Sequence, residues 1–213
     1  MRLLTFDTET TGLPVYGASF TDTDKWPHII QLSYIIYDTD TGQLTIVNDI
    51  IKLDENVDIP EDSIKIHGIT REISNTKGIP IIEALTKFRK HVKESHMIIA
   101  HNLCFDKQMI MVESGRNNFR HELYKNRNYY CTMKNSQDIC KIELVNSKTG
   151  EKYYKRPKLC ELYKHLFNEE PKNTHNALID VLICFRCYYK LEKKIDIYET
   201  SSEFKELFEQ CEI

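Results

Sequence analysis

The sequence has no long hydrophobic run, no excess of positive charge, no internal repeat and no low-complexity segment. A membrane-spanning helix needs about 18 or more consecutive apolar residues, so the first absence argues against an integral membrane protein. The N-terminal stretch reaches an acid at Asp7, too early for a signal peptide, and we therefore expect a soluble, intracellular protein. The seven cysteines are scattered and odd in number, which favours reduced thiols in that compartment.

The charge balance narrows the classes of function. The chain has 29 Lys and Arg against 32 Asp and Glu, a net charge of −3. A protein that holds nucleic acid by bulk electrostatics usually has a clear basic excess, which is missing here. An enzyme that holds phosphates through divalent cations needs carboxylates at its centre, so the composition leaves that class open.

Patterns typical of strands and helices alternate along the chain after an initial run of strands. Short β-favouring runs predict strands, and apolar residues at helical spacing predict helices. The predicted strands are 2–7, 28–38, 44–53, 97–100 and 128–132; the predicted helices are 80–93, 106–114, 159–167, 177–190 and 202–209. This order is typical of an α/β protein with a mixed five-stranded sheet flanked by helices.

No linker interrupts the 213 residues, so we expect a single domain over 1–213. Its core should occupy about residues 1–190, with a C-terminal helix at about 201–210. A polar hairpin at 141–154, within an insertion of about 138–156, is an added element. Together with the long loop 14–27, it could alter access to a substrate.

Two acids stand near the end of the first predicted strand, in the segment FDTETTGL at 6–13. Because side chains alternate along an extended chain, Asp7 and Glu9 point to the same side. Neighbouring carboxylates are unfavourable unless a cation neutralises them, and Mg²⁺ or Mn²⁺ prefers such oxygen ligands. A polar strand end that runs into a turn is the competing interpretation of this pair.

Two more acids and a histidine have environments that suggest a shared site. Asp106 follows the strand 97–100 near the start of a helix, where it would also complement the helix dipole. Asp180 shares a helix face with small apolar residues, so its carboxylate needs a partner, and a metal ion would serve. His175 lies about 140° from Asp180 if both are in one helix, so they reach one site only if His175 precedes the helix.

The order and spacing of these residues resemble the DEDDh 3′–5′ exonucleases, the family of the DNA polymerase III epsilon subunit, ribonuclease T and oligoribonuclease. The three motifs are Asp7-x-Glu9, Asn102-x-x-Phe105-Asp106 and His175-x-x-x-x-Asp180. Supporting segments are TTGL at 10–13, IIQL at 29–32 and HGIT at 67–70. The resemblance covers about residues 1–189, nearly the whole chain.

The resemblance implies a ribonuclease H-like fold and hydrolysis of phosphodiesters from the 3′ end, with release of nucleoside 5′-monophosphates and two divalent cations, Mg²⁺ or Mn²⁺. It assigns Asp7, Glu9 and Asp180 to one cation, with Asp7 bridging to a second that Asp106 holds through water. It makes His175 the general base. The residues implied to contact the substrate are Thr8, Thr10, Gly12, Leu13, Asn102 and Phe105.

The expected partner is single-stranded nucleic acid or a 3′ terminus, with DNA favoured over RNA. We do not expect the protein to bind a membrane. A polymerase would have to act in trans, because the chain has no room for a polymerase domain; the oligomeric state stays open. An exonuclease that trims RNA and a catalytically idle binding module are the alternatives. The five filled catalytic positions argue against the idle module. Coincidental acids in a structural α/β protein are the third alternative, which a metal titration would test.

The hairpin has cations that allow two interpretations. Lysines on an exposed hairpin discourage pairing between sheet edges. Cations with interleaved tyrosines could instead hold the strand beyond the terminal nucleotides. The residues concerned are Lys148, Lys152, Lys155, Arg156 and Lys158, with Tyr153 and Tyr154 among them.

Overall fold

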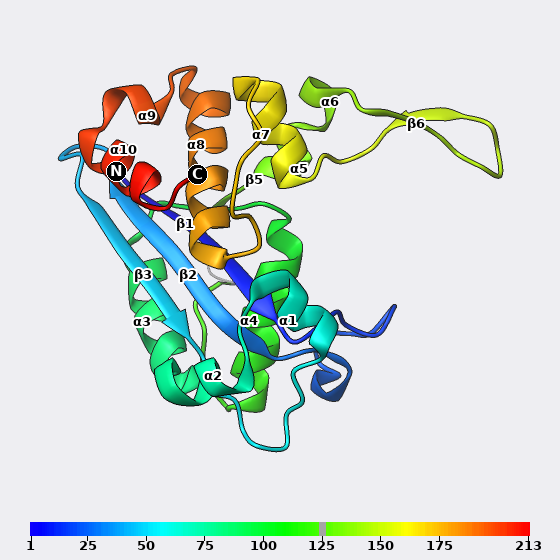
Figure 1. The fold of residues 1–213 in the computed structure, drawn as a ribbon, viewed down its shortest axis with the longest axis vertical. Helices are drawn as coiled ribbons and strands as arrows, with labels where there is room; N and C mark the ends of the chain where they lie inside the picture. Colours follow the sequence, from blue (N-terminus) through cyan, green and yellow to red (C-terminus); the bar gives the residue numbers. More distant parts are fainter. Residues whose placement is uncertain (124–126) are drawn as a thin grey trace.

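The computed structural model describes residues 1–123 and 127–213, and its centre is a five-stranded sheet (Figure 1). The strand order is β3-β2-β1-β4-β5. β1 and β2 are antiparallel, as are β2 and β3, whereas β4 and β5 run parallel to β1. The strands are β1 (Arg2–Thr10), β2 (Ile29–Asp38), β3 (Leu44–Ile50), β4 (Met97–Ala100) and β5 (Asn128–Cys131). The predicted mixed five-stranded sheet is confirmed.

Helices cover both faces of this sheet (Figure 1). One layer contains α3 (Ile81–Glu94) and α4 (Leu103–Arg116); the other contains α7 (Leu159–Phe167), α8 (Ala177–Lys193) and α10 (Ser202–Gln210). The shorter helices are η1 (Thr23–Lys25), α1 (Glu61–His67), α2 (Arg71–Lys77), α5 (Thr132–Asn135), α6 (Gln137–Cys140) and α9 (Ile197–Thr200). Within residues 1–123 and 127–213, no helix has the length and apolar character needed to cross a membrane.

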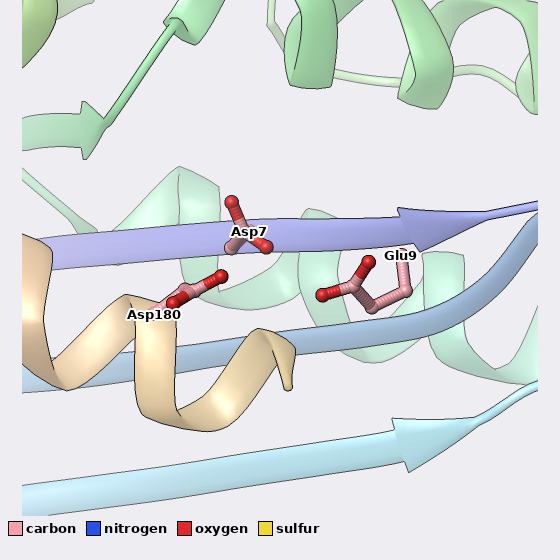
Figure 2. Close-up of side chains that lie close together, drawn as sticks. All are labelled: Asp7, Glu9 and Asp180. Carbon is pink, nitrogen blue, oxygen red and sulfur yellow. The ribbon is translucent and has the colours of Figure 1, made fainter. Parts of the chain in front are cut away.

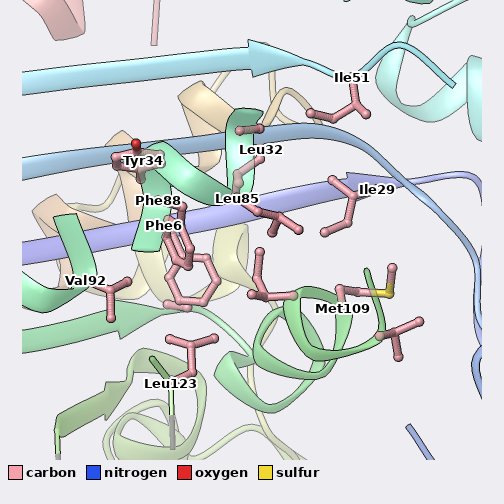
Figure 3. Close-up of a cluster of buried hydrophobic side chains, with 14 of the residues drawn as sticks. Phe6, Ile29, Leu32, Tyr34, Ile51, Leu85, Phe88, Val92, Met109 and Leu123 are labelled. Atoms are coloured by element: carbon pink, nitrogen blue, oxygen red, sulfur yellow. The ribbon is translucent and has the colours of Figure 1, made fainter. Parts of the chain in front are cut away.

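Alternation along β1 supplies side chains to both layers. Phe6 packs in the α3 and α4 layer, with its ring centroid 5.1 Å from that of Phe88 (Figure 3). Leu3 packs in the other layer, which contains the buried face of α8. Since neighbouring side chains of a strand point to opposite faces, Asp7 lies on the α8 side and Thr8 on the α4 side. The sheet thus determines which helix each residue of the acidic segment can meet.

β1 is longer than the sequence predicts. The expected strand ends at Asp7, whereas the observed strand continues to Thr10. The reason is that β2 extends alongside and supplies partners, with Glu9 opposite Gln31 and Thr10 opposite Ile29. The register shifts between Glu9 and Thr10, where the strand gives way to the following loop.

Two short helices, α1 and α2, lie in a segment for which the sequence predicts neither strand nor helix. Each has seven residues, too few for apolar periodicity to be recognised. Gly68 ends α1 with a φ of +73°, a conformation that favours glycine. The Thr70 side chain then caps α2 by accepting a hydrogen bond from the Ile73 N–H. The HGIT segment at 67–70 is therefore the junction between two helices.

The chain also forms a separate two-stranded sheet, β6 (Glu143–Val145) and β7 (Lys152–Tyr154). Both strands lie within the predicted hairpin at 141–154. The hairpin projects away from the central sheet as an arm, at the right of the view (Figure 1).

Candidate active site

Three carboxylates meet where β1 approaches the N-terminus of α8 (Figure 2). One oxygen each of Asp7, Glu9 and Asp180 lies within 4.8 Å of the others. Ligand oxygens about 2.0–2.6 Å from one cation are at most about 4–5 Å apart, so these three can share a divalent cation. Asp7 and Glu9 are brought together by strand alternation, and Asp180 by its place in the first turn of α8.

Asp106 approaches the same cluster from α4 and is buried. Its Oδ1 accepts hydrogen bonds from the Thr8 N–H at 3.2 Å and the Thr8 hydroxyl at 2.8 Å. Asp106 does not belong to the group of three that can share one ion. Thr8, predicted to contact the substrate, has a buried side chain whose hydroxyl is turned toward Asp106.

Burial makes all four carboxylates hard to ionise, and repulsion between carboxylates adds to the effect for Asp7, Glu9 and Asp106. Burial raises the pKa of Asp7 well above its ordinary value, and the charges of Asp106, Asp180 and Glu9 raise it further. Burial, together with the charges of Asp180 and Asp106, raises the pKa of Glu9 to about 8. Burial also raises the pKa of Asp106 to about 7 and that of Asp180 to about 6. Such a cluster is unstable when fully charged unless positive charge is added.

The donor set fits a hard divalent cation. Asp180 Oδ1 is buried and has no hydrogen-bond partner among the residues that the structure describes. Its other oxygen accepts a hydrogen bond from the His175 N–H at 3.3 Å. A buried carboxylate oxygen without a donor, beside two further carboxylates, is suited to metal ligation.

His175 lies in the loop before α8, as a shared site with Asp180 requires. The helix begins at Ala177, and the Asn176 side chain caps it by accepting from the Leu178 N–H at 3.1 Å. His175 has a φ of +69°, which turns the chain just before the cap, and its side chain is exposed. The imidazole is near enough to Asp180 to oppose, when protonated, the rise in its pKa that burial causes.

Gln31 connects β2 to α8, a role that the sequence analysis missed. This buried side chain accepts a hydrogen bond from the Ala177 N–H at 3.2 Å and donates to Asn48 Oδ1 at 2.8 Å. Ala177 is the first residue of the helix that carries Asp180, and Gln31 lies opposite Glu9 in the sheet. The IIQL segment at 29–32 was the only signal, and nothing in it identifies the distant partner.

The predicted substrate contacts of the β1–β2 loop lie at the end of β1. The Leu13 side chain is 84% exposed, so it is available to a ligand. The Thr10 hydroxyl donates to the Gly12 carbonyl at 2.7 Å. Gly12 has a φ of +156°, which side-chain-bearing residues rarely adopt.

Arg116 at the end of α4 holds the rest of this long loop. Its Nη2 donates to the carbonyls of Thr23 and Trp26, both at 2.6 Å, and its Nη1 to that of Pro27 at 2.8 Å. Glu113 pairs with Arg116 at 2.8 Å. The loop 14–27 is thus attached to the helix that carries Asp106.

The two remaining predicted contacts lie around the start of α4. Asn102 occupies the N-cap position of this helix in the left-handed conformation, with a φ of +61°, and is exposed. Phe105 is half-buried and packs against the core on the α3 and α4 side. Both lie within four residues of Asp106.

The raised pKa values predict how the metal-free protein responds to pH. The folded state holds protons that the unfolded chain releases, so stability from this source is present at low pH and lost as pH rises. For Glu9 the window runs from its ordinary value of 4.5 to about 8. In a chelator, the melting temperature should therefore fall between about pH 5 and pH 8.

Saturating Mg²⁺ should raise the melting temperature more at pH 8 than at pH 5, because the ligands must be deprotonated. Thermal unfolding at both pH values, with Glu9→Gln as the matched control, measures this. The control should show a smaller pH dependence. A melting temperature that stays level or rises toward pH 8 in the chelator would contradict the account.

The mixed five-stranded sheet with helices on both faces is that of the ribonuclease H-like exonuclease fold. A family model described as exonuclease matches residues 4–188, and the chain belongs to this family. The predicted exonuclease family is confirmed by this match. A comparison with curated proteins finds no match.

Solved structures with a similar fold include E. coli exonuclease I in complex with a dT13 oligonucleotide, at 16% identity and a TM-score of 0.66. That similarity covers 97% of this chain but 43% of exonuclease I, so the chain spans less than half of that protein. The nuclease domain of 3′hExo, a DEDDh family member bound to rAMP, has 13% identity and a TM-score of 0.66, over 91% of this chain and 92% of that one. Cell-death related nuclease 4 (CRN-4) has 14% identity and a TM-score of 0.62, over 92% of this chain and 64% of that one. At these identities the likeness shows the fold alone.

Proposed function

We propose that the protein removes nucleoside 5′-monophosphates from the 3′ end of single-stranded DNA, with two Mg²⁺ or Mn²⁺ ions. The convergence of Asp7, Glu9 and Asp180 carries this proposal, because one oxygen of each lies within 4.8 Å of the others. The proposal treats residues 1–213 as one catalytic unit, because β1, α4 and α8, which lie far apart in the chain, each contribute acids. All five residues proposed to take part in hydrolysis are present in the chain, so we infer a catalyst and not an idle binding module. They are Asp7, Glu9, Asp106, His175 and Asp180.

Asp7, Glu9 and Asp180 would hold one cation, and Asp106 together with Asp7 would hold a second. The Thr8 N–H and hydroxyl keep Asp106 oriented toward the cluster. Bound cations of this kind lower the pKa of an attacking water and stabilise the leaving 3′ oxygen. The four carboxylates would then be ionised and stable together, which the raised pKa values oppose in their absence.

His175 would take a proton from the attacking water as the general base. Its side chain is exposed beside Asp180, on a loop that the hydrogen bond between its own N–H and Asp180 holds in place. A histidine changes charge near neutral pH, which suits a general base. The exposed position leaves the ring free to reach a water at the cluster.

Thr10, Gly12 and Leu13 would meet the terminal nucleotide, with exposed Leu13 against its base, and Asn102 and Phe105 would also contact the substrate. For Thr8, contact with the nucleotide stays a prediction. Single-stranded DNA is favoured because exonuclease I has a similar fold in complex with a dT13 oligonucleotide. RNA trimming is the second candidate, since 3′hExo is bound to rAMP. A polymerase would act in trans.

A requirement for a free 3′ end is the expected result that tests the proposal. Linear 5′-labelled DNA should be shortened stepwise from its 3′ end in Mg²⁺ or Mn²⁺, whereas closed circles and 3′-phosphorylated strands should resist. Matched RNA on the same gel compares the sugars. Rapid cutting of circular single strands would instead indicate an endonuclease.

A further inference from the structure

The arm, defined as residues 141–158, is the most basic segment of an acidic protein. It contains six of the 29 Lys and Arg of the chain but only two of the 32 Asp and Glu. The cations are Lys141, Lys148, Lys152, Lys155, Arg156 and Lys158; the acids are Glu143 and Glu151. This concentration of positive charge is set apart from the acidic site.

The strands of the arm are exposed on both faces. Leu144 pairs with Tyr153, and Val145 with Lys152, so the two pairs point to opposite sides. All four are exposed, with Val145 at 58% and Tyr153 at 49%. An isolated two-stranded hairpin is at best marginally stable, so an arm with no buried face gains stability from a ligand that covers it.

The root of the arm is nevertheless fixed to the body of the protein. Burial lowers the pKa of His101 to about 4, so its ring is neutral near pH 7. Its Nε2–H donates to the Pro157 carbonyl at 3.1 Å, and its Nδ1 then accepts from the Thr132 hydroxyl at 2.9 Å. The Gln137 side chain donates to the Tyr154 carbonyl at 2.7 Å. The arm therefore has a defined starting point on the body.

That starting point is close in the chain to the site. His101 comes five residues before Asp106 and directly before Asn102, at the junction of β4 and α4. From there the arm extends outward (Figure 1). A strand whose 3′ end lies at the acids and whose upstream part runs past α4 would meet the root of the arm before its tip.

Two of the cations are neutralised within the protein. Lys152 pairs with Glu143 at 2.8 Å, and Lys155 pairs with Glu161 in the first turn of α7. In contrast, no carboxylate of the described residues pairs with Lys148 near the tip or with Arg156 at the root, and both are exposed. Their charges are available to phosphates.

We propose that the arm binds the single-stranded substrate upstream of its 3′ end, an inference that rests on the proposed function. Arg156 would contact a phosphate nearer the 3′ end and Lys148 one farther upstream, and Tyr153 would stack on a base. Unpaired cations beside an exposed aromatic ring are the combination that recognises a single strand without reading its sequence. A protein partner would be expected to cover the apolar pairs and leave the salt dependence unchanged.

The test compares Lys148→Ala/Arg156→Ala with the wild type on oligo(dT) from a dinucleotide to a 20-mer. The wild-type KM should fall as the strand lengthens, whereas the KM of the variant should stay near its short-strand value. The log–log dependence of KM on salt for the 20-mer should become shallower by about 1.4, since each phosphate contact on a single strand accounts for roughly 0.7. Cleavage of the dinucleotide should be unchanged, because it ends before the arm.

The single variants test the direction of the strand. Arg156→Ala should raise KM from a shorter length onward than Lys148→Ala, because Arg156 is at the root and Lys148 near the tip. Tyr153→Ala should raise KM on the 20-mer roughly tenfold, and Tyr153→Phe should retain wild-type KM because it keeps the ring. The control Lys90→Ala/Lys205→Ala removes two exposed charges from α3 and α10 and should leave the length profile unchanged.

A wild-type length profile and salt slope in Lys148→Ala/Arg156→Ala would overturn the proposal. So would a loss of self-association in that variant, measured by light scattering, with unaltered binding of DNA, since the arm would then be a protein contact. Fluorescence anisotropy of a labelled 20-mer in Ca²⁺ separates this inference from the proposed function. If the wild type binds through the arm but cleaves nothing, the proposed function fails and the arm proposal stands.

Discussion

Replacing Asp7 by asparagine should reduce hydrolysis by at least roughly 10²–10³-fold, the loss typical of removing one preorganised charge contact. Asp7 adjoins every other acid of the cluster, since the charges of Asp106, Asp180 and Glu9 all act on it. The amide keeps the shape of the side chain but removes the charge that would attract a cation. Initial rates on a 5′-labelled oligonucleotide in saturating Mg²⁺ measure the effect, and Asp180→Asn should behave alike.

The fold should survive this change. Because Asp7→Asn removes one member of a mutually repelling group, the melting temperature without metal should be unchanged or higher. Asp62→Asn, which alters an exposed acid of α1, is the matched control and should keep the wild-type rate. Ca²⁺ should bind but support little turnover, because it is larger and laxer in geometry than Mg²⁺. Full activity in EDTA, or in Asp7→Asn, would refute the assignment of the site.

Replacing His175 by alanine should lower kcat roughly 10²–10⁴-fold at neutral pH, the usual contribution of a positioned general base. The reason is the place of His175 in the loop before α8, with its N–H bonded to Asp180 and its side chain exposed. The affinity for Mg²⁺ should change little, because the imidazole is not among the proposed ligands. Rates across pH 5–9 in saturating Mg²⁺ measure the loss of kcat, and a titration of the rate with Mg²⁺ at one pH measures the affinity for the metal.

The acid limb of the pH profile distinguishes a base from a structural residue. Bound metal keeps the carboxylates ionised, so their protonation should not limit the rate at low pH. The loss of activity at low pH should then report protonation of His175, and the pH profile of His175→Ala should lack this acid limb. His175→Asn is the second variant, because asparagine tolerates the φ of +69° without supplying a base. The exposed His165→Ala is the control. If His175→Asn and His175→Ala both retained the wild-type rate and acid limb, the base would have to be another group.

Much of the candidate site could be predicted because its acids follow local rules. Strand alternation alone places Asp7 and Glu9 on one side of β1. The apolar face around Asp180 indicated a buried carboxylate in need of a partner, and its Oδ1 is indeed buried without a hydrogen bond among the described residues. The position of His175 outside α8 followed from helical geometry.

Features that depend on residues far apart in the chain could not be predicted. The extension of β1 to Thr10 depends on β2, which pairs with it through Gln31 and Ile29. The orientation of Asp106 depends on the Thr8 hydroxyl, 98 residues away. No periodicity encodes such contacts, because a hydrogen bond between distant segments leaves no local pattern.

The sequence by itself determined the class of fold and the presence of a basic hairpin, since periodicity and composition are local properties, and it predicted the acids and the histidine of the candidate site through the spacing of their motifs and the resemblance that it carries. Only the tertiary structure decided that Gln31 receives the first N–H of α8, and that His101 fixes the root of the arm. It also decided which cations of the arm are free, because Lys152 and Lys155 are paired while Lys148 and Arg156 are not, among the residues described. Pairing of charges depends on which side chains folding brings within a few ångströms, and identical lysines in the sequence therefore differ in what they can bind.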